Sequence, residues 1–239
     1  MDDTKLILPI RDMTSPAVIH ETASWLAIYK PPGLVVESNP HEPSLADWVE
    51  IHLNKTSRKS FVGVIHRLDR MTSGIILFAK KKWSLKIFNQ AFSKRLVQKD
   101  YLCLLSESPE IRQGRLTHWL QKINGQFKVE ISPRPRPGYQ ECILDYSVLG
   151  EAGNYTVADI RLGTGRYHQI RAQFSQIGFP LVGDIIYGSR LTLPANRIAL
   201  HAYRLSFEEP ETNQKLTLFC PPNKDEVWPE LTDYLYNLV

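Results

Sequence analysis

The sequence predicts an α+β fold built around a largely antiparallel β-sheet. Many short apolar or alternating segments, separated by turn residues, are typical of strands. Only a few segments carry the spacing of an amphipathic helix. The two kinds of segment do not alternate regularly, as a doubly wound parallel sheet would require. With 239 residues, 43% of them hydrophobic, the chain is long enough to bury a substantial core.

Two apolar runs define the clearest strands. WLAIYK, at residues 25–30, is apolar and ends at Pro31-Pro32-Gly33, and IILFA, at 75–79, is short and dense enough for a buried strand. The other predicted strands are 97–105, 116–120, 127–131, 143–149, 155–162, 198–207 and 215–219. We expect an irregular lead-in up to residue 18. In domain terms, we expect a lead-in of 1–24 and one domain of 25–239.

Four segments predict helices. Ser44 begins one that runs to about residue 53, with Asp47 placed as its capping-box partner. Residues 83–95 carry apolar side chains at helical spacing, and 168–177 forms a helix that Gly178 ends. A closing helix is expected over 225–238. PRPRP, at residues 133–137, predicts an exposed basic loop with extended backbone.

The charge is unevenly distributed. Residues 51–100 hold twelve basic and two acidic residues, a net +10, whereas the rest of the chain holds 17 basic and 23 acidic residues, a net −6. Such a block indicates an anionic partner such as nucleic acid, or else a solvated basic face. The three cysteines (Cys103, Cys142 and Cys220) are far apart and form no CxxC pair, which argues against disulfides and structural zinc. Without an apolar span or a signal peptide at MDDTKL, we expect no membrane contact and a cytoplasmic location.

A polar segment, HRLDRMTSG at residues 66–74, separates two apolar runs and therefore suits a functional loop. It places Asp69 between Arg67 and Arg70, and cations on both sides keep a carboxylate ionised. Such a carboxylate is able to act as a nucleophile or base. Taken alone, however, the pattern favours a salt-bridged turn aspartate.

A second segment, GTGRYHQIR at residues 163–171, places glycines before a predicted helix and cationic groups at its first turn. This arrangement fits an anion site or a capped surface helix. It lacks the Gly-Lys-Ser/Thr of a P-loop and the third glycine of a dinucleotide site. Tyr101, in Lys99-Asp100-Tyr101, is either a core residue or a surface on which a base stacks. No spacing of histidines indicates a metal site.

Together these segments resemble the RluA-type family of pseudouridine synthases. The likeness runs from about Trp25 to Trp228, and HRLDxxTSG followed by GxGRxHQxR is highly specific. Its pieces are YKPPG (29–33), HRLDRMTSG (66–74), KDY (99–101), GTGRYHQIR (163–171), GD (183–184), YG (187–188) and LHA (200–202). The family usually has a small residue at Pro32 and often Asn at Tyr29.

The resemblance implies the pseudouridine synthase fold, with a central mixed, mainly antiparallel sheet, flanking helices and a catalytic cleft. Asp69 would be the catalytic carboxylate. Tyr101 would pack against the target base and take part in deprotonation at C5. Arg171 would pair with Asp69 and hold it ionised. Arg67 would fill the gap that the flipped nucleotide leaves in the RNA stack.

The resemblance also implies an RNA-binding set and a partner. The expected RNA-binding residues are His66, Arg67, Arg70, Thr72, Ser73, Arg166, His168 and Gln169, of which His66, Thr72 and Ser73 would shape the loop. The substrate would be tRNA or large-subunit ribosomal RNA. No cofactor or metal is expected, since the reaction is an internal rearrangement. We expect a monomer without the S4-like module of some relatives, in which case the basic block and the PRPRP loop would hold the RNA.

Two other functions stay open at this point. The first is an RNA-binding or RNA-remodelling protein whose main role does not need catalysis. The second is a glycosidase-like hydrolase, which normally needs a second placed carboxylate. No acidic residue lies near the HRLD motif in the sequence to fill that part.

Overall fold

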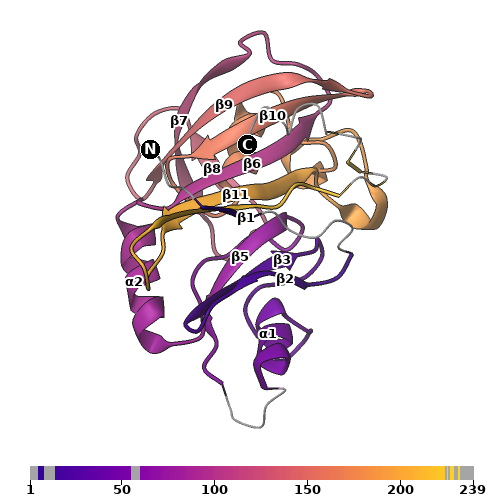
Figure 1. Cartoon of the computed structure of the whole chain (residues 1–239). Coiled ribbons are helices and arrows are strands. Elements are labelled where there is room, and N and C mark those ends of the chain that lie inside the picture. Colours follow the sequence, from indigo (N-terminus) through magenta and orange to yellow (C-terminus); the bar gives the residue numbers. More distant parts are fainter. Residues whose placement is uncertain are drawn as a thin grey trace. The chain divides into compact units, whose positions relative to one another are not determined.

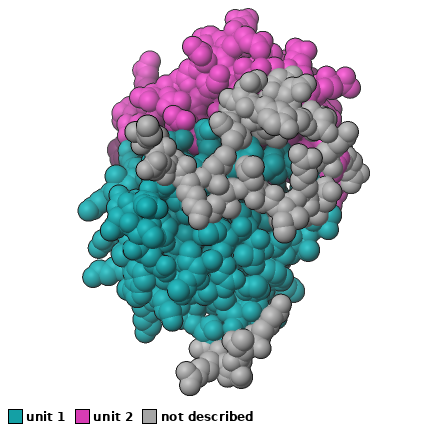
Figure 2. All heavy atoms as spheres, in the orientation of Figure 1, with its two compact units in different colours: residues 1–99, 202–223 teal, residues 100–201, 224–239 magenta. Residues whose placement is uncertain are grey.

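The computed structural model describes residues 5–7, 14–54, 60–223, 225, 227–228 and 231. The chain divides into two compact units (Figure 2). The first unit is made of residues 1–99 and 202–223, and the second of residues 100–201 and 224–239.

The first unit is built on a sheet in which β2, β3, β5 and β11 follow one another in that order (Figure 1). β2 pairs with β3, and β3 with β5, in antiparallel fashion, while the short β4 pairs with β5. β12 is antiparallel to β11, and β1 is parallel to β12. The strands are β1 (Lys5–Ile7), β2 (Ala17–Glu21), β3 (Trp25–Lys30), β4 (Gly63–Val64), β5 (Ser73–Ala79), β11 (Leu200–Glu208) and β12 (Lys215–Phe219).

The pairing of β3 with β5 places two loops side by side. Lys30 lies opposite Gly74 at one end of this ladder, and Trp25 lies opposite Ala79 at the other. The loop that follows β3 and the loop that precedes β5 therefore lie at the same end of this pair of strands. Gly74 has a φ of +120°, and a Cβ there would lie 2.2 Å from the carbonyl oxygen of Ala202. Only glycine fits this position.

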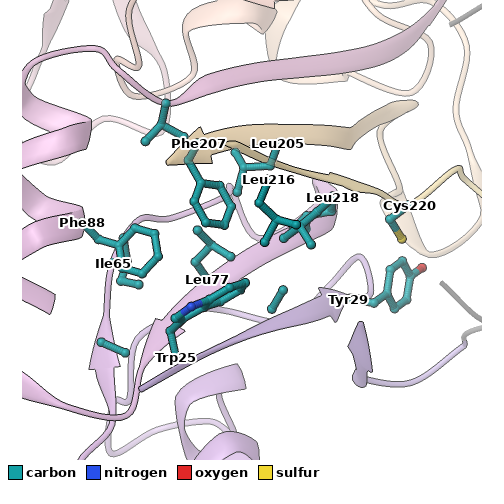
Figure 3. Close-up of a cluster of buried hydrophobic side chains, with 14 residues drawn as sticks. Trp25, Tyr29, Ile65, Leu77, Phe88, Leu205, Phe207, Leu216, Leu218 and Cys220 are labelled. Carbon is teal, nitrogen blue, oxygen red and sulfur yellow. The ribbon is translucent and has the colours of Figure 1, made fainter. Parts of the chain in front are cut away.

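Two α-helices lie in the described part of the first unit. α1 (Leu45–Leu53) begins at Ser44, whose hydroxyl accepts from the Asp47 N–H while the Asp47 carboxylate accepts from the Ser44 N–H, so the predicted capping box is confirmed. α2 (Lys82–Ser93) buries Phe88, whose ring meets Trp25 edge-on at 5.9 Å. Figure 3 shows this core, in which side chains from β3, β5, β11, β12 and α2 meet.

The second unit is a sheet of five antiparallel strands in the order β6, β10, β9, β7, β8. Helix α3 follows β10 and packs on this sheet through Ala172, beside Leu120 and Cys142. The elements are β6 (Gln98–Leu105), β7 (Gln113–Lys122), β8 (Val129–Ser132), β9 (Gln140–Ala152), β10 (Tyr155–Leu162), α3 (Gln169–Gln176) and the 3₁₀ turns η2 (Ile185–Tyr187) and η3 (Pro194–Asn196).

The predicted α+β class is confirmed: eight of the strand pairs described above are antiparallel, and the pair β1 and β12 is parallel. The irregular lead-in expected up to residue 18 was wrong for β1 and for the first two residues of β2, a half-buried strand whose sequence, AVIHE, shows no alternation. β8 begins two residues later than predicted, after the turn at Asn124-Gly125. The predicted closing helix lies almost wholly outside the described residues. No helix in the described part of the chain is long and apolar enough to cross a membrane.

Candidate active site

The HRLD loop (residues 66–74) enters β5 in the first unit. Asp69 is half-buried in this loop, and its carbonyl oxygen accepts from the Thr72 N–H at 3.1 Å, which closes a turn. The carboxylate is thus carried on a turn rather than in the sheet. This placement leaves Asp69 partly open to solvent on a backbone that is fixed on both sides.

The buried side chain of Lys30 stabilises this turn. Its side chain is fully buried, and its Nζ donates to the carbonyl oxygens of Pro31 (3.0 Å), Leu34 (2.7 Å) and Arg70 (2.8 Å). Burial lowers the pKa of the Lys30 ammonium to about 7, while the nearby Asp69 charge raises it. Lys30 therefore ties the residue after Asp69 to the loop after β3, and its charge lies within electrostatic reach of the carboxylate.

The same two loops are joined a second time through Gly33 and Arg70. The Gly33 N–H donates to the Arg70 carbonyl at 2.8 Å, and Arg70 Nε donates to the Gly33 carbonyl at 3.0 Å. Arg70 also pairs with Glu42 at 2.8 Å. Arg67 extends outward and pairs with Glu37 at 3.0 Å, with 68% and 58% of the two side chains exposed. Of the two flanking arginines, Arg70 fastens the loop and Arg67 is available to a ligand.

His66 is fixed inside the protein. Its Nε2 accepts from the backbone N–H of Leu77 at 3.1 Å, and its ring stacks on Phe92 at 4.8 Å. Burial and the nearby Lys99 charge lower the pKa of His66 to about 3, so the ring is neutral at pH 7. Thr72 and Ser73 are buried, whereas His66 is half-buried. Contact of these three residues with RNA stays a prediction, and the internal hydrogen bond of His66 and the burial of Thr72 and Ser73 favour the loop-shaping role.

The second cluster lies in the second unit, where α3 begins. Arg171 is 4% exposed and binds the 1% exposed Asp184 through two parallel bonds, Nε to Oδ2 at 2.7 Å and Nη2 to Oδ1 at 2.9 Å. Its guanidinium carbon lies 5.0 Å from the centre of the Tyr187 ring. A planar guanidinium held by two bonds and an aromatic face has little freedom to turn.

His168 stands at the start of α3 with a left-handed backbone, φ 53°. Its Nδ1 lies 3.1 Å from the Tyr187 hydroxyl, which accepts from the Val129 N–H at 2.9 Å. Tyr167 stacks on the imidazole at 3.8 Å. Burial, followed by the charges of Arg171 and Lys122, lowers the pKa of His168 to about 3, so this ring too is neutral. It serves as a packed hydrogen-bonding group here, and its expected contact with RNA stays a prediction.

Gln169 forms hydrogen bonds with other residues of the GTGRYHQIR segment and with β9. Its Oε1 accepts from the Thr164 hydroxyl (2.7 Å) and the Arg166 N–H (3.0 Å), and its Nε2 donates to the Ile143 carbonyl (3.0 Å) and to Gln173 (3.0 Å). All four hydrogen-bonding positions of this buried amide are thus used internally. The Arg166 side chain stays exposed, with Nε 3.3 Å from the Glu141 carbonyl. Of the residues expected to bind RNA here, Arg166 is the one at the surface.

Tyr101 lies on β6, opposite Ile160 of β10, and is 7% exposed. Its neighbour Asp100 is fully buried and accepts from Arg161 Nε at 3.0 Å. The tyrosine is therefore anchored by the sheet of the second unit. Its predicted stacking on a target base stays a prediction.

The structure brings together part of the predicted site within each unit. In the first unit Asp69 lies by Lys30, and in the second Arg171 lies by His168. The predicted pairs of Asp69 with Arg171 and Tyr101, and the catalytic cleft, would join the two units and stay predictions.

Two supporting residues, Lys30 and Asp184, received no role from the sequence, although both stand in segments that carried the resemblance. No group of three or more His, Cys, Asp or Glu side chains among the described residues is placed to hold a metal ion.

Comparison with known proteins identifies the family to which this chain is similar. Residues 24–176 match the model of the RNA pseudouridylate synthase family, a span that includes the HRLD loop and the second cluster as far as Arg171. An uncharacterised RNA pseudouridine synthase of Helicobacter pylori is 32% identical over 219 residues, which are 87% of this chain and 67% of that protein. The ribosomal large subunit pseudouridine synthase D of Vibrio vulnificus is 29% identical over 240 residues, 91% of this chain and 70% of that protein.

Solved structures show the same fold. The human RNA pseudouridylate synthase domain containing 1 covers 94% of this chain and 94% of its own, with a TM-score of 0.72 and 21% identity. The human domain containing 4 protein also has a TM-score of 0.72, at 20% identity, over 87% of this chain and 88% of its own. The predicted pseudouridine synthase fold is thereby confirmed.

Proposed function

This chain belongs to the RluA-type family of RNA pseudouridine synthases and acts on RNA as an isomerase, and we propose that Asp69 is its catalytic carboxylate. The observation that carries the proposal is the setting of Asp69. It is a half-buried carboxylate on a closed turn, beside the buried ammonium of Lys30, in the segment that carries the family motif. A nearby cation keeps a carboxylate ionised, and the ionised form is the one that attacks or accepts a proton.

The reaction breaks the N1–C1′ bond of a uridine, rotates the base and forms a C5–C1′ bond. The proton at C5 is lost and N1 gains one, so the atoms balance without an outside group or a change in redox state. Asp69 acts in the first step, either by bonding to the sugar or by removing a proton so that a glycal-like intermediate forms. Tyr101 packs against the base and takes part in deprotonation at C5.

Arg171 is proposed as the partner that orients the Asp69 carboxylate. Its bidentate bond to Asp184 and its stacking on Tyr187 support this role, because they fix the guanidinium plane without any contribution from substrate. A target base has to leave the RNA stack before it reaches such a site, at a cost of a few kcal/mol. The exposed guanidinium of Arg67 is proposed to offset part of that cost by filling the gap.

The substrate is proposed to be a specific uridine of tRNA or large-subunit ribosomal RNA. The name of the Vibrio vulnificus relative supports a ribosomal substrate, whereas the site residues do not separate the two classes. We further propose that the protein works as a monomer in the cytoplasm. Mapping pseudouridines in total RNA from strains with and without the gene tests the substrate, since a site that disappears with the gene names it.

Substitution of Asp69 tests the catalytic assignment. Asp69→Asn keeps the shape of the side chain and removes its charge, so we expect a folded protein that forms no detectable pseudouridine. Asp145→Asn changes an exposed carboxylate in the same way and should retain activity. Turnover by the Asp69→Asn protein on RNA from the deletion strain would sink the proposal. Complementation of the deletion by that variant would assign the main role to RNA binding instead.

A further inference from the structure

Helix α2 presents a shallow groove on its solvent side. The groove has a volume of about 430 Å³ and is lined by Lys82, Leu85, Lys86, Asn89, Gln90 and Ser93. Lys82, Lys86, Asn89 and Ser93 are spaced by four, three and four residues, which places them in one row along the helix. The row offers two ammonium groups, then an amide and a hydroxyl, above an apolar floor at Leu85.

The charge of this row is uncompensated. No acidic residue occurs between Asp69 and Asp100, and α2 has no acidic residue in its first turn. Lys82 and Lys86 form no ion pair in the described part of the chain, and the same holds for the exposed Lys81, Lys94 and Arg95 around the ends of α2. By contrast, Lys80, just before the helix, pairs with Glu21 at 2.7 Å. Cations gathered without counter-charges repel one another and favour an anionic partner.

The neighbouring row of α2 carries exposed apolar side chains. Trp83 is 47% exposed and Ile87 is 41% exposed, one position further round the helix from Lys82 and Lys86. An exposed indole beside lysines matches the way proteins hold single-stranded RNA, with cations on the backbone and an aromatic ring beneath a base. An anion that lacks an aromatic ring would not stack on the indole, so the pairing of lysines with Trp83 favours a nucleic acid.

The helix is also joined to the catalytic loop. Phe92, in the last turn of α2, stacks on His66 of the HRLD loop at 4.8 Å, and the Nζ of Lys99 lies 5.9 Å from the centre of the same Phe92 ring. All three residues belong to the first unit. The groove thus ends at Ser93, next to a side chain that touches the loop carrying Asp69.

We propose that the α2 groove binds the sugar–phosphate backbone of the RNA substrate, outside the site of chemistry, with Lys82 and Lys86 on successive phosphates and Trp83 beneath a neighbouring base. A separation of four residues corresponds to a rise of about 6 Å along the helix, close to the spacing of phosphates in an extended strand. The proposal rests on the proposed function for its choice of RNA. It adds a second place where that RNA is held, within the first unit of this chain.

Binding is tested with a fluorescein-labelled 20-nucleotide oligouridylate, followed by anisotropy over a series of NaCl concentrations. Each phosphate contact contributes about 0.7 to the slope of log affinity against log salt for a single strand. Lys82→Gln/Lys86→Gln should therefore lower the slope by about 1.4 and weaken binding by about 25-fold at 0.1 M salt. Lys82→Arg/Lys86→Arg should bind as the wild type does, because the charges remain. Arg112→Gln/Arg190→Gln removes two exposed charges in the second unit and should have a much smaller effect.

Activity on total RNA from the deletion strain separates this proposal from the proposed function. If the wild type forms no pseudouridine, the proposed function fails. If it does, the Gln double variant should show a raised KM with kcat within about twofold of the wild type. An unchanged KM and an unchanged salt slope would overturn the groove proposal while leaving the function intact. Loss of binding to polyglutamate but not to oligouridylate would also overturn it, by assigning the groove to an acidic protein.

Discussion

The HRLD loop and the 163–171 segment both carry proposed site residues, yet they are held in opposite ways. Backbone carbonyls fix the HRLD loop, three of them bound by Lys30, and its arginines pair with acids at the surface. In the 163–171 segment, buried side chains satisfy one another, with Gln169 and Arg171 as the centres. One segment leaves its carboxylate half open, whereas the other hides its guanidinium.

The difference teaches how the two roles are divided. As the proposed catalytic carboxylate, Asp69 must be reached by the substrate and therefore cannot be surrounded by packed side chains. A residue that orients another must not move, and a buried bidentate pair provides this. The buried polar network therefore surrounds Arg171, which is the proposed orienting residue. The half-buried carboxylate of Asp69 is held through the backbone of its turn.

The largest expected effect is on stability, and it concerns two Arg–Asp pairs with the same geometry in the second unit. Arg171–Asp184 is buried, whereas Arg115–Asp145 has equal bond lengths of 2.7 and 2.9 Å but is 66% and 44% exposed. Asp184→Ala leaves a buried guanidinium without its partner and should cost about 3–5 kcal/mol of unfolding free energy. Asp145→Ala should change it very little. Urea denaturation followed by circular dichroism measures both.

A second outcome is expected from the same variant. Because Asp184 fixes the plane of Arg171, Asp184→Asn should lower kcat more than it raises KM. Equal stability losses for Asp184→Ala and Asp145→Ala would break the comparison between a buried and an exposed support. A normal kcat in a well-folded Asp184→Asn protein would show that Arg171 needs no such support.

The next effect in size is a loss of stability in acid, and both segments should share it. His66 and His168 are neutral in the folded protein, with pKa values lowered to about 3, whereas an unfolded histidine has a pKa near 6.5. The stability that a lowered pKa supports is fully present above pH 6.5 and is lost as pH falls toward 3, because only the unfolded chain takes up the proton. At pH 5.5 each histidine should lower the free energy of unfolding by about 1.4 kcal/mol relative to its value at pH 8.

Substitution isolates this effect for each histidine. His66→Gln retains an acceptor for the Leu77 N–H but does not titrate, and His168→Asn tolerates the left-handed backbone at that position. Each variant should lose less stability than the wild type between pH 8 and pH 5.5. Denaturation curves at the two pH values measure the difference. If only one variant flattens the pH dependence, the two segments do not share a neutral buried histidine.

Much of this organisation was predictable from local sequence. The α1 cap follows from Ser44 and Asp47 three residues apart, and the dense run after Gly74 is the buried strand β5. The HRLD and GxGRxHQxR segments marked the two places where the proposed site residues lie. These are short-range patterns, in which the residues that interact are also close in the chain.

The rest depended on contacts between distant residues. Lys30 binds a carbonyl 40 residues away, and in the sequence it is simply the last residue of an apolar strand. Asp184 meets Arg171 only because η2 turns back toward α3. For His168 and Gln169, the motif predicted contact with RNA, but their burial depends on Tyr187 and Ile143, which local pattern does not bring near. Spacing alone does not determine whether a polar residue is buried, and contact of His168 and Gln169 with RNA stays a prediction.

Substitution of Arg67 should have the smallest effect on stability. A change in activity would therefore report on contact of the HRLD loop with RNA and not on folding. The pair of Arg67 with Glu37 is exposed on both sides, so Arg67→Gln should change the unfolding free energy by less than about 0.5 kcal/mol. Yet if Arg67 fills the gap left by the flipped nucleotide, kcat/KM on RNA from the deletion strain should fall by about tenfold or more. Glu37→Gln breaks the same ion pair and keeps the arginine, so its activity should stay near that of the wild type. Equal activities for the two variants would mean that Arg67 acts only through Glu37 and has no direct contact with the RNA.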